Sequence, residues 1–373
     1  MDFIPVCEPF LNGNESAYVS ECIKTGWISS AGKYVNAFEE KFAEYCGVNH
    51  AVAVCNGTVA LHLALIAAGV KKGDEVIIPD FTMIASAFAV CYIGAVPVFV
   101  DVNKDTWNID VNLIEEKISP RTKAIMPVSI FGQPCEMSTI WQIAEKYNIT
   151  VIEDAAESHG AEYEAKRTGA LADITAFSFF ANKNLTTGEG GMVVTNNYDY
   201  YVRAKYYKNL CFPLDSPRTY IHQDIGFNYR ISNIHAAIGL AQLERADEYI
   251  KMRISNADLY KKKLSKTEGI IFQRSLSNVK SVHWMNGIII DPQKYGRTKD
   301  ELMLHLKTNN IDTRLFFTGM HLQPSLINYG CNSTGLFPVT EWLSQNGFYL
   351  PSASNLREDQ IEYICDVIKN FKN

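Results

Sequence analysis

The sequence of 373 residues predicts an α/β protein with a mostly parallel sheet in a large domain and a smaller α+β domain at the C-terminal end. Between about residues 50 and 200, short apolar runs alternate with segments of helical periodicity, which is typical of a parallel sheet covered on both faces. From about residue 250 a lysine-rich helix is followed by mixed helices and strands. We therefore expect a large domain over residues 1–249 and a small domain over residues 250–373.

The first half of the chain supplies most of this alternation. Helices are expected where apolar residues recur at helical spacing, and strands where a short run is continuously apolar and rich in β-branched residues. The expected helices are 14–25, 33–46, 60–68, 84–92, 111–117 and 137–146, and the expected strands are 51–54, 75–78, 97–100, 124–128 and 150–152.

Residues 174–195 predict a strand, a loop and a second strand. The apolar run Ile174–Phe180 ends just before Lys183, a loop with three glycines follows, and the run Met192–Thr195 closes the segment. Residues 199–230 lack a clear period and predict a helix and then a long loop. Further along, helices are expected at 231–249, 299–309 and 358–371, and strands at 282–290 and 313–317.

Composition argues against several classes of partner. A net charge of −6 gives no electrostatic reason to expect nucleic acid or an anionic membrane. The nine cysteines contain no C-x-x-C pair, which is typical of reduced thiols and not of a zinc site or a disulfide framework. The sequence begins without a signal-peptide pattern and has no apolar run of membrane-spanning length. We expect a cytoplasmic protein without a metal centre.

Four segments follow predicted strands and should lie at one edge of the sheet: residues 55–58, residues 80–83, residues 154–157 and the loop of Lys183. The first contains Asn56, Gly57 and Thr58 ahead of a helix. Such a helix start binds anions through its free N–H groups and dipole. The same residues also form an ordinary turn with a helix cap, and the segment alone does not decide between the two.

Asp154 and Lys183 each have two interpretations as well. A carboxylate at the end of a buried strand needs a partner, which is either a helix cap or a protonated ring nitrogen. A lysine in a loop is either a solvated cation or a desolvated amine that reacts with a carbonyl group. Together with the helix start and the Ser178 hydroxyl, these are the groups that pyridoxal phosphate (PLP) requires.

The motifs resemble those of the DegT/DnrJ/StrS family of PLP-dependent nucleotide-sugar aminotransferases. The similarity runs nearly from end to end and is most specific in S-F-F-A-N-K-N-L-T-T-G-E-G-G-M. The stretches that carry it are residues 26–32, 56–65, 151–160, 178–192 and 226–243.

This resemblance implies a type I PLP fold that works as a homodimer with active sites at the subunit interface. It implies that Lys183 forms the Schiff base with the cofactor and shuttles the proton, that Asp154 pairs with the ring nitrogen, and that Glu157 lies near the phenolic oxygen. It further implies that Gly57, Thr58 and Ser178 hold the phosphate and that Asn228 reaches the phosphate of the neighbouring subunit's cofactor.

Two positions depart from the commonest family pattern, and a third is informative. Met83 stands where an aromatic residue often stacks on the ring, and its polarisable sulfur packs there less rigidly. Glu157 replaces a frequent glutamine. Lys183 is retained where relatives that dehydrate the sugar have histidine, which favours transamination.

Within the family, segments 178–183, 216–222 and 320–324 resemble the branch that converts GDP-4-keto-6-deoxymannose to GDP-perosamine with glutamate as amino donor. A UDP- or dTDP-linked 4-keto-6-deoxyhexose is the alternative substrate, and a non-catalytic binding protein on the same fold is the alternative class. The resemblance implies candidate substrate contacts at Trp27, Ser29, His159, Arg218, His222, Arg230, Arg314 and His321.

Overall fold

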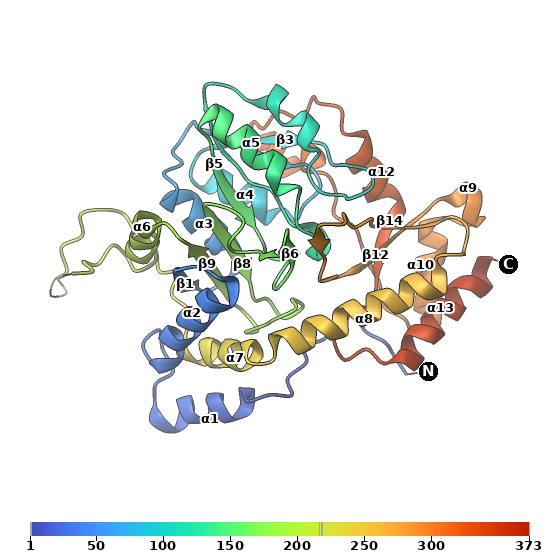
Figure 1. Ribbon diagram of the computed structural model, residues 1–373, viewed down its shortest axis with the longest axis horizontal. Coiled ribbons are helices and arrows are strands. Elements are labelled where there is room, and N and C mark those ends of the chain that lie inside the picture. Colours follow the sequence, from blue (N-terminus) through green and yellow to red (C-terminus); the bar gives the residue numbers. More distant parts are fainter. Residues whose placement is uncertain (1, 216, 218, 373) are drawn as a thin grey trace.

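A seven-stranded sheet organises the large domain of the computed structural model, which describes residues 2–215, 217 and 219–372 (Figure 1). The strand order is β1-β9-β8-β5-β4-β2-β3. Strands β2, β3, β4, β5 and β8 run parallel to one another, whereas β9 pairs antiparallel with both β1 and β8. The strands are β1 (His50–Val54), β2 (Glu75–Pro79), β3 (Val96–Val100), β4 (Thr122–Ile125), β5 (Thr150–Asp154), β8 (Ile174–Ser178) and β9 (Gly191–Thr195).

Helices cover both faces of this sheet because its strands are apolar on both sides. Val52 and Val54 of β1 pack with α3, α4 and α6, whereas Ala51 and Ala53 pack with α2 and α7 on the opposite face. Helix α5 covers that second face over β2 to β5. The helices are α1 (Glu15–Thr25), α2 (Lys33–Cys46), α3 (Gly57–Ala67), α4 (Ala85–Tyr92), α5 (Met137–Tyr147), α6 (Tyr198–Lys208) and α7 (Asn233–Leu243).

The small domain is a four-stranded antiparallel sheet, ordered β10-β12-β14-β13, packed against helices α8, α10 and α13. Its strands are β10 (Ile270–Phe272), β12 (Asn286–Ile290), β13 (Arg314–Leu315) and β14 (Gly347–Leu350). Its helices are α8 (Ala246–Leu264), α9 (Pro292–Tyr295), α10 (Lys299–Thr308), α11 (Pro324–Tyr329), α12 (Pro338–Asn346) and α13 (Glu358–Lys372). A third sheet, β11-β6-β7, joins Val279–Lys280, Glu162–Tyr163 and Lys166–Arg167.

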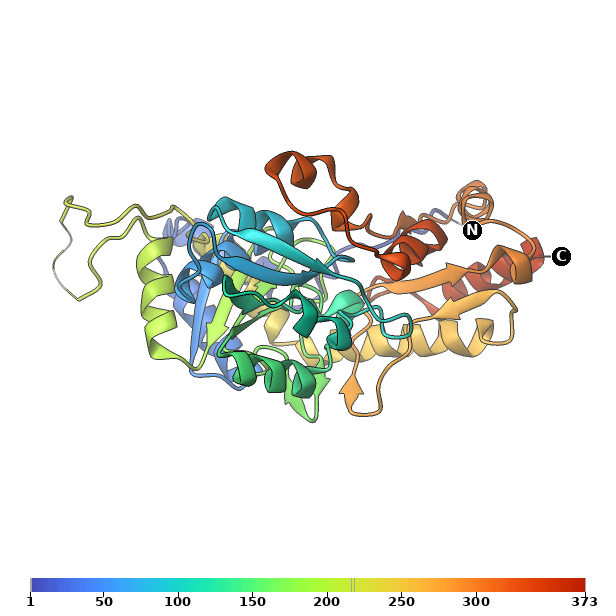
Figure 2. The same ribbon diagram turned by 90° about the horizontal axis from the view of Figure 1, so that it is seen from above.

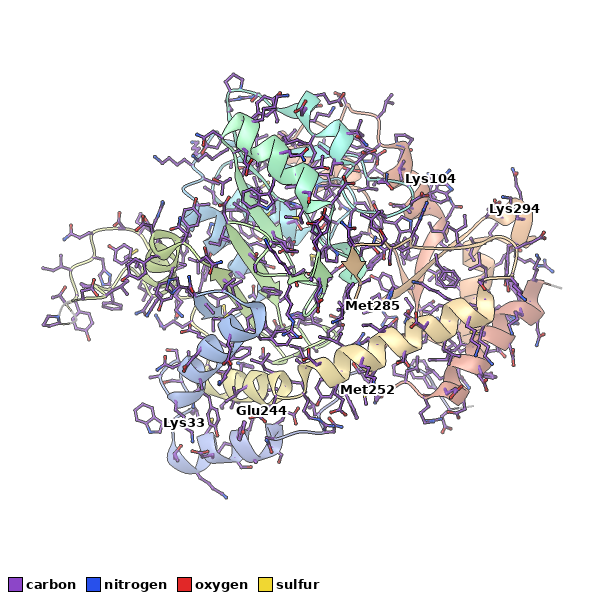
Figure 3. The ribbon with its side chains drawn as sticks, viewed as in Figure 1. Lys33, Lys104, Glu244, Met252, Met285 and Lys294 are labelled. Atoms are coloured by element: carbon purple, nitrogen blue, oxygen red, sulfur yellow. The ribbon has the colours of Figure 1, made fainter. Side chains whose placement is uncertain are left out.

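The two domains lie at opposite ends of an elongated molecule. Lys33 on α2 and Glu244 after α7 mark the large-domain end, and Lys294 on α9 marks the other (Figure 3). Helix α8 runs from one domain to the other (Figure 1). The first residues pack on the small domain, since Ile4 exchanges backbone hydrogen bonds with residues 310 and 312. We keep the division into residues 1–249 and 250–373 as a proposal.

Two predicted helices differ from the structure. Residues 111–117 form two 3₁₀ turns, η1 (Val111–Leu113) and η2 (Glu115–Lys117), because backbone bonds span three residues from Asp110 and from Ile114. The predicted helix 231–249 is divided between α7 and α8. The Ser232 hydroxyl accepts the His235 N–H and starts α7 there, and Arg245 leaves the helical conformation before α8 begins.

The described residues between 209 and 228, which follow α6, project from the body of the large domain as an arm (Figures 1 and 2). Tyr220, Ile221 and Ile225 expose 83%, 71% and 90% of their surface there.

Further short 3₁₀ turns are η3 (Ile130–Gly132) and η4 (Met320–Leu322). Among the described residues, no helix combines the length and apolar character needed to cross a membrane.

Candidate active site

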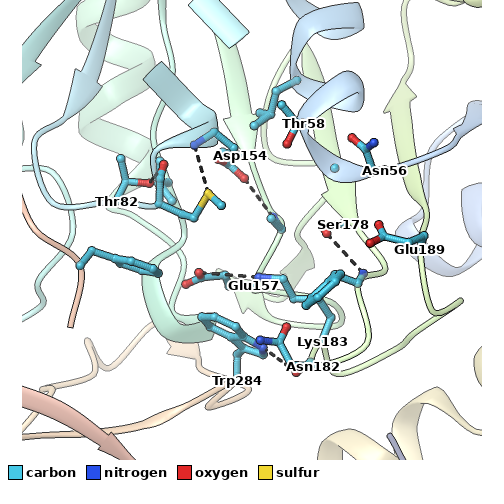
Figure 4. A pocket seen from close by; sticks show the side chains of 18 of the residues that line it. Asn56, Thr58, Thr82, Asp154, Glu157, Ser178, Asn182, Lys183, Glu189 and Trp284 are labelled. Atoms are coloured by element: carbon cyan, nitrogen blue, oxygen red, sulfur yellow. Dashed lines mark hydrogen bonds and ion pairs between the residues drawn. The ribbon is translucent and has the colours of Figure 1, made fainter. Parts of the chain in front are cut away.

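A cavity of about 470 Å³ lies at the carboxyl ends of the parallel strands, between the two domains (Figure 4). The large domain contributes the start of α3, the residues after β2, the end of β5 and the loop between β8 and β9. The small domain contributes Trp284, Phe317 and Tyr349. The strand-end segments expected to lie together are therefore neighbours, and they share one pocket with three aromatic side chains that the sequence did not single out.

One end of the pocket is the N-terminus of α3. The Asn56 side chain caps this helix by accepting the Val59 N–H at 3.0 Å. Gly57 lies directly against Ser178, because a Cβ on Gly57 would stand 2.5 Å from Cβ and 2.8 Å from Oγ of Ser178. Thr58 lines the same wall. Free helix N–H groups beside two hydroxyls form a cradle that suits a phosphate group.

Asp154 lies at the end of β5 and is 5% exposed. Its Oδ2 accepts the Ser86 hydroxyl at 2.7 Å, and its Oδ1 accepts the Ala156 N–H at 3.1 Å. Burial raises the pKa of this carboxyl, while both hydrogen bonds and the charge of Lys183 oppose the rise. Each oxygen retains a lone pair, so the group can accept one further hydrogen bond from the pocket side.

Lys183 lies between a carboxylate and an indole ring. Its Nζ is 3.7 Å from Glu157 Oε1 and 3.7 Å from the centre of the Trp284 ring. Burial lowers the pKa of the lysine and raises the pKa of Glu157, which drives both groups toward their neutral forms. Glu157 is fixed from the other side, since its Oε2 accepts the Phe131 N–H at 2.7 Å. A desolvated amine of this kind is nucleophilic.

These residues fit PLP. The cofactor needs a cradle for its phosphate, a carboxylate for its ring nitrogen and an amine for its aldehyde, and the pocket presents one of each from three different segments. The buried Oδ1 of Asn182, which lacks a hydrogen-bond partner, also lines the pocket. The interpretation of Lys183 as a solvated loop cation is excluded by its burial, because only 11% of its side chain is exposed.

Met83 and Asn228 lie in different surroundings. Met83 lines the pocket, and its sulfur accepts the Ala85 N–H at 3.1 Å, which holds the side chain at the start of α4. Asn228 is outside this pocket: it pairs with Asn209 at the base of the arm. Arg230 lies nearby and donates hydrogen bonds to Ser30 and Asn209.

Several expected substrate contacts are outside the pocket lining, on exposed loops or, for Arg314, on strand β13 at the edge of the pocket. Trp27 is 57% exposed, and Ser29 lies beside it, with its carbonyl bound by the Asn233 N–H. His222 lies on the arm with Nδ1 2.7 Å from the Leu210 carbonyl. Arg314 forms an exposed ion pair with Asp312, on a strand whose neighbour carries Tyr349. Arg218 lies outside the described residues.

His159 and His321 are buried, which differs from the expected contact with substrate. His159 is enclosed by Phe42, Phe177 and Phe179, and burial lowers its pKa to about 3. His321 has Nδ1 2.6 Å from the buried Asp80 carboxylate and Nε2 3.5 Å from Glu341. Neither ring lies among the pocket residues, because each fills an interior site in this chain.

Sequence reasoning missed Asn182 and Trp284, which line the pocket, and Ser86, which supports Asp154 from behind it. Trp284 is about a hundred residues from Lys183 in the chain, and the strand-end rule concerns only the large sheet. The Trp284 indole N–H donates to the Asn182 carbonyl at 2.8 Å, which brings the small domain onto the lysine loop. Ser86 is a small polar residue near the start of the largely apolar helix α4, and the need of such a buried hydroxyl for a partner was the available signal.

Two full-length relatives are GDP-perosamine synthases. The enzyme of Escherichia coli O157:H7 is 44% identical and covers 100% of this chain and 99% of its own length. The enzyme of Caulobacter vibrioides is 43% identical over 97% of this chain and 96% of its own length.

Solved structures share the fold. DesV of S. venezuelae, determined in complex with a ketimine intermediate, superposes with a TM-score of 0.93 at 30% identity and covers 100% of this chain and 99% of its own. DesI, determined in the presence of its TDP-sugar product, has a TM-score of 0.90 at 30% identity, with coverages of 100% and 93%.

The family pattern of the DegT/DnrJ/EryC1/StrS aminotransferases matches residues 9–369. With the full-length relatives and the shared fold, this match confirms the resemblance read from the motifs, the type I PLP fold and the cofactor. The chain belongs to the DegT/DnrJ/EryC1/StrS family of PLP-dependent aminotransferases.

Proposed function

We propose that this protein transfers an amino group from glutamate to C4 of GDP-4-keto-6-deoxymannose and so produces GDP-perosamine. The observation that carries the proposal is the desolvated Lys183 amine at the bottom of a pocket that also holds a phosphate cradle and a buried carboxylate. The choice of sugar rests on the two full-length relatives, which are named for GDP-perosamine.

Each pocket residue has a separate task in this proposal. When bound, PLP supplies an electron sink and a carrier for the amino group. Lys183 would hold the cofactor through its aldehyde, and its Nζ would carry the proton that is moved, a task for which a lowered amine pKa is suited. Asp154 would hold the proton on the ring nitrogen, and Glu157 would lie near the phenolic oxygen. The N-terminus of α3, with Gly57, Thr58 and Ser178, holds the phosphate.

The complete site is composed of two copies of the chain. Asn228 and Arg230 at the base of the arm, and Trp27 and Ser29 in the N-terminal loop, are outside the pocket of their own chain. The exposed apolar side chains of the arm and of the N-terminal loop suit burial against a second copy. In a homodimer, Asn228 reaches the partner's phosphate, and Trp27, Ser29, Arg230 and His222 contact the partner's substrate.

The first test is the absorption spectrum of the purified protein before and after glutamate is added. A visible cofactor band that glutamate converts to a near-ultraviolet band supports both the cofactor chemistry and the amino donor. A band that glutamate leaves unchanged contradicts glutamate as donor. No band after PLP is added would overturn the proposed activity.

A dTDP-linked 4-keto-6-deoxy sugar is the second candidate, because DesI was determined with a TDP-sugar product and shares 30% identity with this chain. Competition binding with GDP, UDP and dTDP separates the candidates. We expect GDP to bind the protein more tightly than dTDP, and preferential binding of dTDP would move the assignment to the second sugar.

A further inference from the structure

The turn that begins α4 supports the pocket in two ways. Met83 projects from this turn into the pocket, and its sulfur is held by the Ala85 N–H at 3.1 Å. Ser86, three residues later, is fully buried and donates its hydroxyl to Asp154 Oδ2 at 2.7 Å. Met83, which lines the pocket, and Ser86, which supports the Asp154 carboxylate, therefore come from one short segment.

The hydrogen bonds of this segment have a fixed direction. An ionised carboxylate only accepts, so the Ser86 proton is committed to Asp154. Thr82 Oγ1 is 3.0 Å from Ser86 Oγ and 3.5 Å from the Met83 carbonyl, and with the Ser86 proton on Asp154 the Thr82 hydroxyl is the donor in the shorter contact. Thr82 is 1% exposed. The result is a chain from Thr82 to Ser86 to Asp154, and such chains strengthen each member bond.

We propose that Ser86, with Thr82 behind it, is the positioning residue that fixes the plane of the Asp154 carboxylate and keeps it ionised, so that it can hold a proton on the ring nitrogen of PLP. The inference rests on the proposed function, because Asp154 is the ring-nitrogen partner there. Ser86 acts through Asp154 and is not itself in the pocket lining.

Electrostatics around Asp154 make this support necessary. Burial is the largest influence on the carboxyl and raises its pKa, and the buried carboxyls Glu153 and Glu157 lie close enough for mutual repulsion. The Ser86 hydroxyl, the Ala156 N–H and the Lys183 charge favour the ionised form.

A matched control is available at Glu153, whose side chain lies on the other face of β5 and also accepts a serine hydroxyl. Ser129 is also buried and donates its hydroxyl to a neighbouring carboxylate, Glu153, at 2.9 Å. Glu153 is one residue before Asp154 and therefore points to the opposite face of the sheet. Ser129→Ala removes the same kind of hydrogen bond from the strand without touching the pocket.

The experiment measures PLP affinity of the cofactor-free protein and the ¹⁵N chemical shift of the ring nitrogen in bound, labelled PLP. For Ser86→Ala we expect affinity about tenfold lower, since hydrogen bonds to charged groups are the stronger ones. We also expect a ¹⁵N shift displaced toward the unprotonated ring. Thr82→Val, which is isosteric, should move both quantities in the same direction by about twofold in affinity. Ser129→Ala should change neither.

A wild-type ¹⁵N shift and affinity in Ser86→Ala would overturn the inference and leave the proposed function standing. If Ser86→Ala fails to fold, Thr82→Val decides, and an unchanged ring-nitrogen signal in that variant overturns the inference. If the wild-type protein itself does not bind PLP, the proposed function fails and the inference falls with it.

Discussion

The pocket at the strand ends and the exposed loops differ in how many of their functional side chains already have partners within a single chain. In the pocket, Asp154, Glu157 and Lys183 are buried and each already has a partner at a fixed distance. On the arm and in the N-terminal loop, the candidate substrate residues are exposed and contact mainly their own segments. The buried residues proposed to carry the cofactor chemistry therefore belong to one chain, whereas most residues proposed for substrate binding lie on surfaces that are exposed in a single copy.

Among the substitutions in the pocket, Lys183→Ala should reduce turnover the most. Without the amine, we expect turnover to fall by roughly a thousandfold or more, because nucleophile and proton carrier are lost together. The circular-dichroism spectrum should remain that of the wild type. Amino transfer from glutamate to the nucleotide sugar is the measurement. Lys294→Ala is the control, since this lysine is 71% exposed on α9, and it should leave turnover unchanged. Turnover of Lys183→Ala near the wild-type rate would contradict the role of Lys183.

Gly57→Ala tests the phosphate cradle. Its Cβ would stand 2.5 Å from Cβ of Ser178, so the start of α3 must move away from β8. We expect PLP affinity to fall roughly tenfold or more, in line with the cost of overpacking. Titration of the cofactor-free protein with PLP measures this. Gly13→Ala, whose Cβ would meet atoms no closer than 3.3 Å, should bind PLP as the wild type does. Equal affinities in both variants would count against the cradle.

Mixing two inactive variants tests whether the site is shared. If Asn228 serves the partner's cofactor, a heterodimer of Lys183→Ala and Asn228→Ala chains has one intact site. An equimolar mixture refolded together should then regain about a quarter of wild-type activity by random pairing. Two copies of the same variant provide the control. Failure to regain activity in a mixture shown to contain heterodimers would place Asn228 with its own chain.

The smallest effect on activity is expected at Glu153, on the face of β5 away from the pocket, where a substitution should change stability instead. Burial raises the pKa of Glu153 to about 7 from 4.5. The folded protein therefore holds this proton more tightly than the unfolded chain, and stability falls as pH rises from about 4.5 to about 7. Glu153→Gln removes the titration, so it should be the more stable protein above pH 7, by up to about 3 kcal/mol.

Thermal unfolding at pH 5 and pH 8 measures this difference. The gap between Glu153→Gln and the wild type should widen at the higher pH, whereas Glu40→Gln, at an exposed position on α2, should show the same gap at both. A gap that does not depend on pH would mean that Glu153 is already ionised in the folded protein.

Much of the fold could be predicted because its signals are local. Lys33–Cys46 has a clear helical period and is a helix with those bounds. The run from Ile174 to Thr195 is the strand, loop and strand that its glycines and apolar runs indicate. The break near Arg245 could not be foreseen, because apolar residues keep helical spacing through it and a tertiary contact to the Asn12 carbonyl holds the arginine.

The candidate site divides in the same way. The strand-end rule brings Gly57, Asp154 and Lys183 together, as the structure does. Burial of His321 could not be predicted, since it depends on a partner, Asp80, more than two hundred residues earlier. Trp284 over Lys183 likewise arises from the packing of one domain on the other.

The position of the first residues of the chain limits where the protein can be divided into fragments or circularly permuted. Ile4 exchanges backbone hydrogen bonds with residues 310 and 312, and the Val6 carbonyl accepts the Ser352 N–H, so both ends of the chain lie on the small domain (Figure 1). A fragment that begins at residue 250 would lack this edge. A circularly permuted gene that joins the two ends by a short linker and opens within the arm would keep the small domain whole. The opening would fall between Glu189 and Trp284 and so outside every segment that lines the pocket.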